Sequence, residues 1–172
     1  MFNKETEYAL RSLVYIQLQN NNHRRPGIEE IAEEIEAPRF YTAKILQRMV
    51  KHGVLQSLKG KGGGFYFDKD KPEITLRELI NLTEGNKTIK GCGFGLKYCD
   101  ENNPCPLHEH YAPIRDAIDS LVSTETIQSL ANQYSDGRFN IFDVQAQETA
   151  GTVVLSGRVL DEAQRAVLLN AF

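Results

Sequence analysis

The spacing of apolar residues predicts a series of helices in the first part of the chain. Between residues 6 and 19 apolar side chains recur at the spacing of an amphipathic helix. A polar run through residue 27 ends it, and residues 28–35 predict a short second helix. Residues 39–52 predict a longer helix. Pro38 is well suited to the first turn of this helix, and Gly53 is well suited to the position just after its last turn.

A β-hairpin is predicted directly after the third helix. Residues 54–58 and 65–67 are typical of two short strands, joined by the glycine-rich run Lys-Gly-Lys-Gly-Gly-Gly at 59–64. Helix, short helix, turn, longer helix and hairpin is the element order of a winged helix-turn-helix. The fold class is therefore mainly α with a small β wing.

The second half predicts a long helix and a β-β-α extension. Residues 112–134 are helical in pattern, with a new helix start predicted near 123–125, and one apolar stripe holds Ile114, Ala117, Ile118, Leu121 and Val122. Residues 139–147 alternate loosely and 152–159 are β-rich, with a turn at 149–151. Residues 163–169 predict a last helix, capped by Asp161. No function follows for this extension.

Charge is segregated along the chain, although the net charge is only −3. Residues 29–36 carry acids and no base, whereas 39–61 carry bases and no acid. Two solvated faces would explain this, but a helix and wing of this kind also predict a phosphate-binding surface. The candidate DNA-contacting residues are Arg39, Tyr41, Thr42, Lys44 and Arg48 on the helix, and Lys59 and Lys61 on the wing. Phe40, Ile45, Leu46 and Met49 are expected in the core.

Three cysteines and a histidine form the clearest chemical motif. Cys92, Cys99, Cys105 and His108 read C-x(6)-C-x(5)-C-x(2)-H. Three thiolates and an imidazole can close one tetrahedral zinc site or hold an iron–sulfur cluster. The lack of a tight C-x(2–4)-C pair favours the cluster, and metal-free thiol sensing is a third alternative. His110 is a neighbouring substitute for His108.

Several segments together resemble the IscR/NsrR family of bacterial iron–sulfur winged-helix regulators. They are ALRSLVYIQLQN, the stretch from IEEIAEEIEAPRF to GKGGGFYFDKD, ITLRELINLTEG, and the cysteine loop ending in CPLH. The resemblance runs from about residue 2 to about residue 134. Its most specific parts are the GKGGGF wing, the LRELI segment and the three-cysteine loop.

The resemblance implies a cluster ligand set and a dimer. The three cysteines would bind the cluster, and His108 stands where the IscR-like branch has the fourth ligand of a 2Fe–2S cluster. The NsrR-like branch instead holds a 4Fe–4S cluster with an acid from the partner subunit's first helix, a position that Glu7 occupies here. The first cysteine spacing is one residue longer than the commonest IscR-like pattern. A 2Fe–2S cluster is favoured over 4Fe–4S.

The expected organisation follows from these parts. Residues 1–84 are expected to form the DNA-binding domain, 85–111 the cluster-binding loop, 112–134 a dimerisation helix and 135–172 the β-β-α extension. The function expected is a homodimeric regulator that binds a double-stranded DNA operator under control of the cluster; a zinc-stabilised or metal-free thiol-sensing repressor is the alternative. No nucleophile–base pairing indicates an enzyme, and no membrane span or signal segment is expected, so a cytoplasmic location is predicted.

Overall fold

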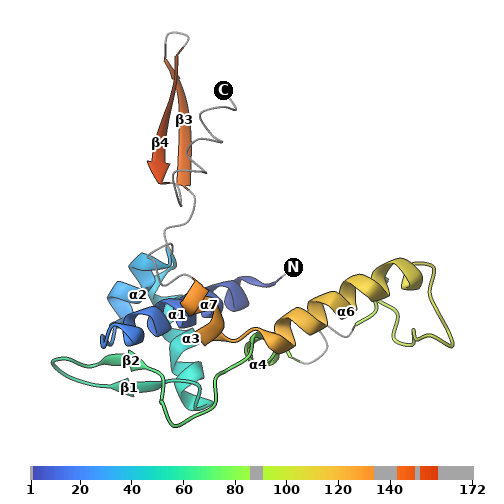
Figure 1. Ribbon diagram of the computed structural model, residues 1–172, viewed down its shortest axis with the longest axis horizontal. Helices are drawn as coiled ribbons and strands as arrows, with labels where there is room; N and C mark the ends of the chain where they lie inside the picture. The colour runs from blue at the N-terminus through green and yellow to red at the C-terminus, as the bar shows by residue number, and fades with distance from the viewer. Residues whose placement is uncertain (1, 86–90, 134–142, 150–151, 159–172) are drawn as a thin grey trace. The chain divides into compact units, whose positions relative to one another are not determined.

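The computed structural model describes residues 2–85, 91–133, 143–149 and 152–158 (Figure 1). The chain divides into two compact units, Met1–Asn132 and Gln133–Phe172. The first unit contains the helices and the wing. The second contains a separate two-stranded sheet. The first unit is mainly α with a small antiparallel sheet, which confirms the predicted fold class.

Three helices form the core of the first unit. They are α1 (Lys4–Asn21), α2 (Ile28–Glu34) and α3 (Arg39–Lys51). The side chain of Asn3 caps α1 by accepting a hydrogen bond from the Thr6 N–H at 2.8 Å, and Gly53 follows α3 with a φ of +73°. The fully buried side chains that these helices share include Leu13, Ile16, Ile31, Ile35, Leu46 and Met49.

The wing consists of β1 (Gln56–Leu58) and β2 (Gly64–Tyr66), which pair antiparallel. β1 begins later than predicted and is shorter, whereas β2 keeps its predicted length and lies one residue earlier in the chain. Val54 and Leu55 bond back to the Met49 carbonyl at the end of α3, and the Phe67 N–H donates to the Asn20 side chain at 2.9 Å. The Phe65 N–H also donates to the Pro26 carbonyl at 3.0 Å, so β2 is attached to the connection between α1 and α2.

The helix α4 (Leu76–Thr83) begins with a capping box. The Thr75 hydroxyl accepts from the Glu78 N–H, and the Glu78 carboxylate accepts from the Thr75 N–H at 2.7 Å. Ile80 of α4 is buried with Val122 of α6 (His108–Thr124). The Arg77 guanidinium also holds α6, pairing with Asp119 and donating to the Ser123 hydroxyl at 2.8 Å.

The predicted long helix is interrupted where the pattern indicated. α6 ends at Thr124, Glu125 is extended, and α7 (Ile127–Gln133) follows. The Leu76 N–H donates to the Glu125 carbonyl at 2.9 Å, so the interruption also ties this segment to the start of α4. α6 begins four residues earlier than predicted, which places Pro113 inside the helix, where it supplies no N–H.

The second unit contains β3 (Asp143–Thr149) and β4 (Thr152–Arg158). They pair antiparallel from Asp143↔Arg158 to Thr149↔Thr152. This confirms a hairpin in the extension, whereas the helix expected at 163–169 lies outside the described residues. Within the described parts of the chain, no helix is both long and apolar enough to span a membrane.

Candidate metal centre and nucleic-acid interface

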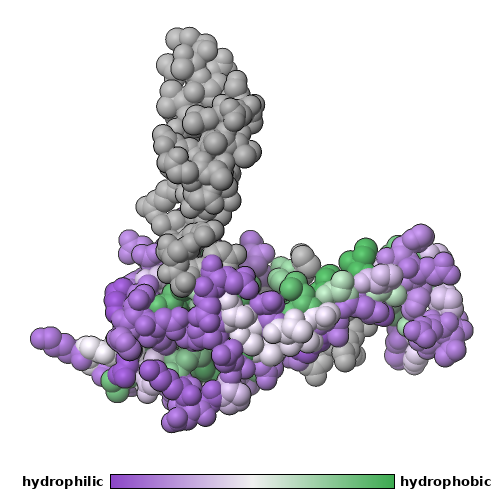
Figure 2. Space-filling view, viewed as in Figure 1, coloured by the Kyte–Doolittle hydropathy of each residue, from purple (hydrophilic) through white to green (hydrophobic). Residues whose placement is uncertain are grey.

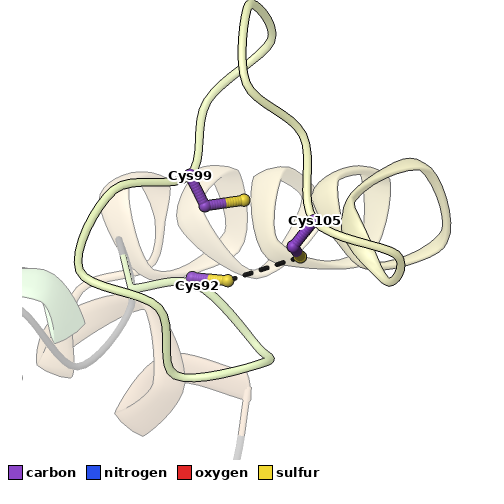
Figure 3. Close-up of side chains that lie close together, drawn as sticks. All are labelled: Cys92, Cys99 and Cys105. Atoms are coloured by element: carbon purple, nitrogen blue, oxygen red, sulfur yellow. Dashed lines mark hydrogen bonds between the residues drawn. The ribbon is translucent and has the colours of Figure 1, made fainter.

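The structure gathers the three cysteines into one group. Their sulfur atoms all lie within 4.8 Å of one another, and Cys92 Sγ is 3.6 Å from Cys105 Sγ. Figure 3 shows the three side chains pointing toward one another from separate parts of the loop that precedes α6. Positions spread over the C-x(6)-C-x(5)-C spacing therefore converge on a volume that suits one small metal centre.

His108 joins this group through Cys99. Its Nδ1 lies 3.2 Å from Cys99 Sγ, and its backbone N–H donates to the Cys105 carbonyl at 2.9 Å. His108 is also the first residue of α6, so the imidazole stands where the loop becomes a helix. The four predicted ligands supply soft sulfur and imidazole donors, which fit zinc and iron–sulfur clusters and fit magnesium or calcium poorly.

The loop packs closely against the start of α6. A Cβ atom on Gly93 would lie 2.7 Å from Cγ of the Tyr111 ring, so only glycine fits there without a shift. Asp100 organises the turn between the second and third cysteines, because its carboxylate accepts from the N–H groups of Asn102 and Asn103, both at 2.9 Å. The Tyr111 ring thus lies directly beside the cysteine-bearing backbone.

The thiols differ in their affinity for protons. Backbone hydrogen bonds from Leu96, the largest cause, and Phe94, together with hydrogen bonds from the neighbouring thiols, outweigh the effect of burial and lower the pKa of Cys92 to about 7. The Cys105 backbone lowers the pKa of Cys99, but burial and the two neighbouring thiols outweigh it, and the net direction is upward. Cys92 is thus the readiest of these two thiols to bind metal as a thiolate.

Glu7, the alternative fourth ligand, lies on α1, and its side chain is partly exposed. Its carboxylate accepts from the Lys4 ammonium at 2.7 Å, and this hydrogen bond lowers the pKa of Glu7. Within this chain Glu7 is not part of the thiol group.

The outward face of α3 differs from the predicted one at two positions. Thr42 was expected to be exposed but is fully buried, and its hydroxyl donates to the Pro38 carbonyl at 3.2 Å. Phe40 was expected in the core but is 82% exposed. The core face follows Thr42, Ile45 and Met49 at helical spacing, and Phe40 lies off that face. The expectation that Thr42 is exposed on this helix is therefore wrong.

The predicted cations divide into free and paired groups. Lys44 on α3 and Lys59 and Lys61 on the wing are exposed. Arg39 is exposed but donates to the Glu29 carboxylate at 2.6 and 2.8 Å. Arg48 is partly buried and paired within the chain: it pairs with Glu5 at 2.8 Å and donates to the Leu82 carbonyl at 2.7 Å.

Three exposed residues of α3 were not among the DNA-contacting residues predicted from the sequence. Phe40, Gln47 and Lys51 are exposed together with Lys44. Positions 40, 44, 47 and 51 lie within about 60° of one another around a helix axis. A helical wheel of this segment alone would have grouped them, because the core positions occupy the other side. We refer to Phe40, Lys44, Gln47 and Lys51 as the outer face of α3.

Apolar side chains are also exposed along α6. Ile114 is 56% and Leu121 is 55% exposed, and Leu107, just before the helix, is 37% exposed. The three positions are spaced by seven residues and therefore share one face. Figure 2 shows hydrophobic surface along this helix. This stripe turns away from the contact with α4, which uses Val122 and Asp119.

Comparisons with known proteins agree on one family. The model of the Rrf2 family, described as an iron-dependent transcriptional regulator, matches residues 2–133. An HTH-type transcriptional regulator of Aquifex aeolicus is 32% identical over 134 residues, covering 77% of this chain and 92% of that protein. The regulator IscR of Photorhabdus laumondii is 25% identical over 125 residues, covering 73% and 75%. NsrR of Shouchella clausii is 28% identical over 103 residues, covering 60% and 65%.

Solved structures share the fold. CymR, the global cysteine regulator of B. subtilis, matches with a TM-score of 0.63 at 19% identity, covering 77% of this chain and 97% of that one. The T. potens IscR matches with a TM-score of 0.60 at 14% identity, covering 80% and 90%. The family and the named relatives are transcriptional regulators and not enzymes, as the sequence predicted. The family match spans most of the chain, and the protein therefore belongs to the Rrf2 family of iron-dependent transcriptional regulators, alongside IscR and NsrR.

Proposed function

We propose that this regulator is a homodimer whose binding to a DNA operator is controlled by an iron–sulfur cluster held by Cys92, Cys99, Cys105 and His108. The observation that carries the proposal is the convergence of three thiols within 4.8 Å, with His108 beside them at the start of α6. The family description as iron-dependent supports iron over zinc. A bound cluster would supply a centre that iron limitation, oxidants or nitric oxide can alter.

A 2Fe–2S cluster is favoured over 4Fe–4S by the position of His108. The imidazole Nδ1 lies 3.2 Å from Cys99 Sγ, so one member of the thiol group is already beside it in the same chain. Glu7 would have to come from a partner subunit and would have to leave Lys4, its partner at 2.7 Å. The role of the protein chain is to hold three thiolates and one imidazole in place.

DNA binding is assigned to the outer face of α3 and to the wing. In helix-turn-helix proteins the second helix enters the major groove and its N-terminal residues meet the base edges. The exposed lysines Lys44, Lys59 and Lys61 would neutralise phosphates or reach into a groove. Arg39 would first have to exchange its Glu29 partner for DNA, whereas Arg48 acts inside the protein.

The metal site connects to the reading helix through packed elements. α6 starts at His108 and is held to α4 by the Arg77–Asp119 pair and the Ile80–Val122 contact. At the other end of α4, the Leu82 carbonyl accepts from Arg48 of α3. A change at the metal site that moves α6 would thus reach α3 through α4. This route supports regulation of DNA affinity by the cluster.

Self-association is assigned to the exposed stripe of α6. Leu107, Ile114 and Leu121 present an apolar row at a seven-residue spacing, which suits packing against the same helix of a second copy. A two-fold pair of reading heads would match a two-fold DNA site and would bind it more tightly than one head.

The deciding experiment measures iron and acid-labile sulfide per chain after anaerobic purification, with an absorption spectrum. Wild type is compared with His108→Ala, and His110→Ala is the matched control because His110 is exposed one half-turn further along α6. We expect roughly two irons and two sulfides per chain in wild type and in His110→Ala. We expect His108→Ala to lose cluster or to change its spectrum, because it removes one ligand.

Other results would redirect the proposal. About four irons per chain, with no effect of His108→Ala, would favour 4Fe–4S with Glu7 as ligand. Colourless protein with one zinc per chain would contradict the cluster altogether. Regulation is tested on the same preparations: if a variant with all three cysteines changed to alanine binds the same DNA with unchanged affinity at fixed salt, the cluster does not control binding.

A further inference from the structure

We infer that Phe40 determines part of the operator sequence by contacting the 5-methyl group of thymine in the major groove. The inference rests on the proposed DNA-binding role of α3. Phe40 is the second residue of α3 and is 82% exposed. An isolated exposed apolar side chain is common on protein surfaces and carries no inference alone. The inference depends on where Phe40 lies on α3.

Phe40 begins the outer face of α3, which continues with Lys44, Gln47 and Lys51. The other members of this face are groups that bind phosphates or base edges: two ammonium groups and a carboxamide. A helix that docks in the major groove places its first residues nearest the bases. Phe40 is therefore the apolar member of an otherwise polar reading surface, at the end of the helix that reads sequence.

The neighbouring aromatic residue does not share this role. The Tyr41 ring packs edge-on against Tyr8 with 5.8 Å between ring centroids, and the Arg11 guanidinium lies 5.0 Å from the centre of the Tyr8 ring. Tyr41 is accordingly only 38% exposed. This packing holds Tyr41 against α1, so the aromatic side chain that projects from the helix is Phe40.

The chemical groups exposed in the DNA major groove then determine what the Phe40 ring can contact. A phenyl ring has no hydrogen-bonding group and gains nothing from a phosphate, which stays hydrated. Among the base edges in the major groove, the 5-methyl of thymine is the apolar group, and phenylalanine is one of the side chains that contacts it. We therefore expect a thymine at the operator position that faces Phe40, and at the symmetry-related position in a two-fold site.

The test uses anaerobically purified full-length protein and an operator obtained by in vitro selection from random duplex DNA. Each thymine of the selected site is replaced in turn by deoxyuridine, which removes only the 5-methyl group. We expect one position per half-site at which wild type loses about fourfold in affinity, the worth of one buried methyl group. Phe40→Ala should bind less tightly than wild type and should be insensitive to deoxyuridine at that position. Phe40→Leu, which keeps an apolar side chain, should restore part of the sensitivity.

Two controls separate this effect from others. The salt dependence of binding should be the same for Phe40→Ala and wild type, because no phosphate contact is lost. Thermal unfolding should also be unchanged, because the side chain is largely exposed. If wild type and Phe40→Ala lose equally at every deoxyuridine, or if no position is sensitive in wild type, the inference is wrong while DNA binding stands. If selection yields no bound sequence at all, the proposed function fails and this inference fails with it.

Discussion

Two buried threonine hydroxyl groups in this protein have different roles, although both belong to threonines within helices. Thr6 is 1% exposed and Thr42 is fully buried. The Thr6 hydroxyl joins α1 to the end of α4, at 2.7 Å from the Thr83 hydroxyl and 2.6 Å from the Glu84 carboxylate. The Thr42 hydroxyl donates only to the Pro38 carbonyl, which already accepts from the backbone N–H of Thr42.

The two threonines therefore form a matched pair for substitution by valine, which keeps their shape. We expect Thr6→Val to lower the free energy of unfolding of the apoprotein by about 1–3 kcal/mol, because it removes a hydroxyl whose partners on α4 lie in a partly buried site. Thr42→Val should cost less than about 1 kcal/mol, because Pro38 keeps its backbone donors. Urea denaturation at one protein concentration measures both. Equal costs would show that the link from α1 to α4 adds little.

At the scale of single residues, the sequence predicted the group of three cysteines better than it predicted the exposed face of α3. The metal-binding chemistry of cysteine and histidine can be recognised from residue type alone. The structure brings Cys92, Cys99 and Cys105 together, as the motif suggested. Exposure on α3 depends instead on which side of the helix meets α1 and α2. The assignment of Phe40 to the core rested on its hydrophobicity alone and was wrong. The buried positions of α3 lie on one side of the helix, and Phe40 lies on the opposite side, toward solvent.

At the scale of elements, the wing depends on glycine for contact as much as for flexibility. Gly64 opens β2 with a φ of +147°, and a Cβ atom there would lie 2.3 Å from the Arg25 carbonyl oxygen. Gly62 at the tip has a φ of +78° with no neighbour within 4 Å of such an atom. The glycine-rich pattern predicted the hairpin, but it did not show which glycine packs against the connection between α1 and α2.

This difference leads to a prediction for two alanine variants of the wing. Gly62→Ala should cost about 1–2 kcal/mol of stability, the strain of a side chain in left-handed backbone. Gly64→Ala should cost about 3 kcal/mol or more of stability. The new side chain would be strained in the same way, and its Cβ atom would also collide with the backbone of Arg25. This substitution should also weaken DNA binding by displacing the wing. Chemical denaturation and DNA titration of both variants test this, and a cost for Gly64→Ala no greater than for Gly62→Ala would contradict the packing role.

The other elements were predictable to the extent that their signals are local. The helices α1 to α3 and the interruption at Glu125 follow from apolar spacing and turn residues, and their ends differ from prediction by a few residues. The start of α6 was placed four residues too late, because its first turn is set by the loop: the His108 N–H donates to the Cys105 carbonyl. Such a contact depends on the folded loop and leaves no helical pattern. The capping box of α4, Thr75 with Glu78, was present as a local signal.

At the scale of the whole molecule, we expect the exposed stripe of α6 to determine self-association. Ile114→Glu with Leu121→Glu should weaken self-association by at least about a hundredfold, because a dimer would have to bury charges in place of two apolar side chains. Ser120→Glu is the control, since Ser120 is exposed on the same helix but off the stripe. Size-exclusion chromatography with light scattering gives the mass. A double variant with the same mass as wild type across dilutions would mean that α6 is not the interface.

Pro113 is expected to let the first turn of α6 open separately from the rest of the helix. Without an N–H at this position, the Glu109 carbonyl lacks its intrahelical donor, and the turn from His108 to Ala112 is joined to the rest of the helix by one backbone hydrogen bond fewer. That turn instead packs on the cysteine loop, through Tyr111 against Gly93. In hydrogen-exchange terms, we expect residues 108–112 to open together with the loop and the segment around Val122 to open together with α4. We therefore expect a disturbance of the thiol group to loosen this first turn, while the helix beyond Pro113 stays folded and moves as one piece against α4.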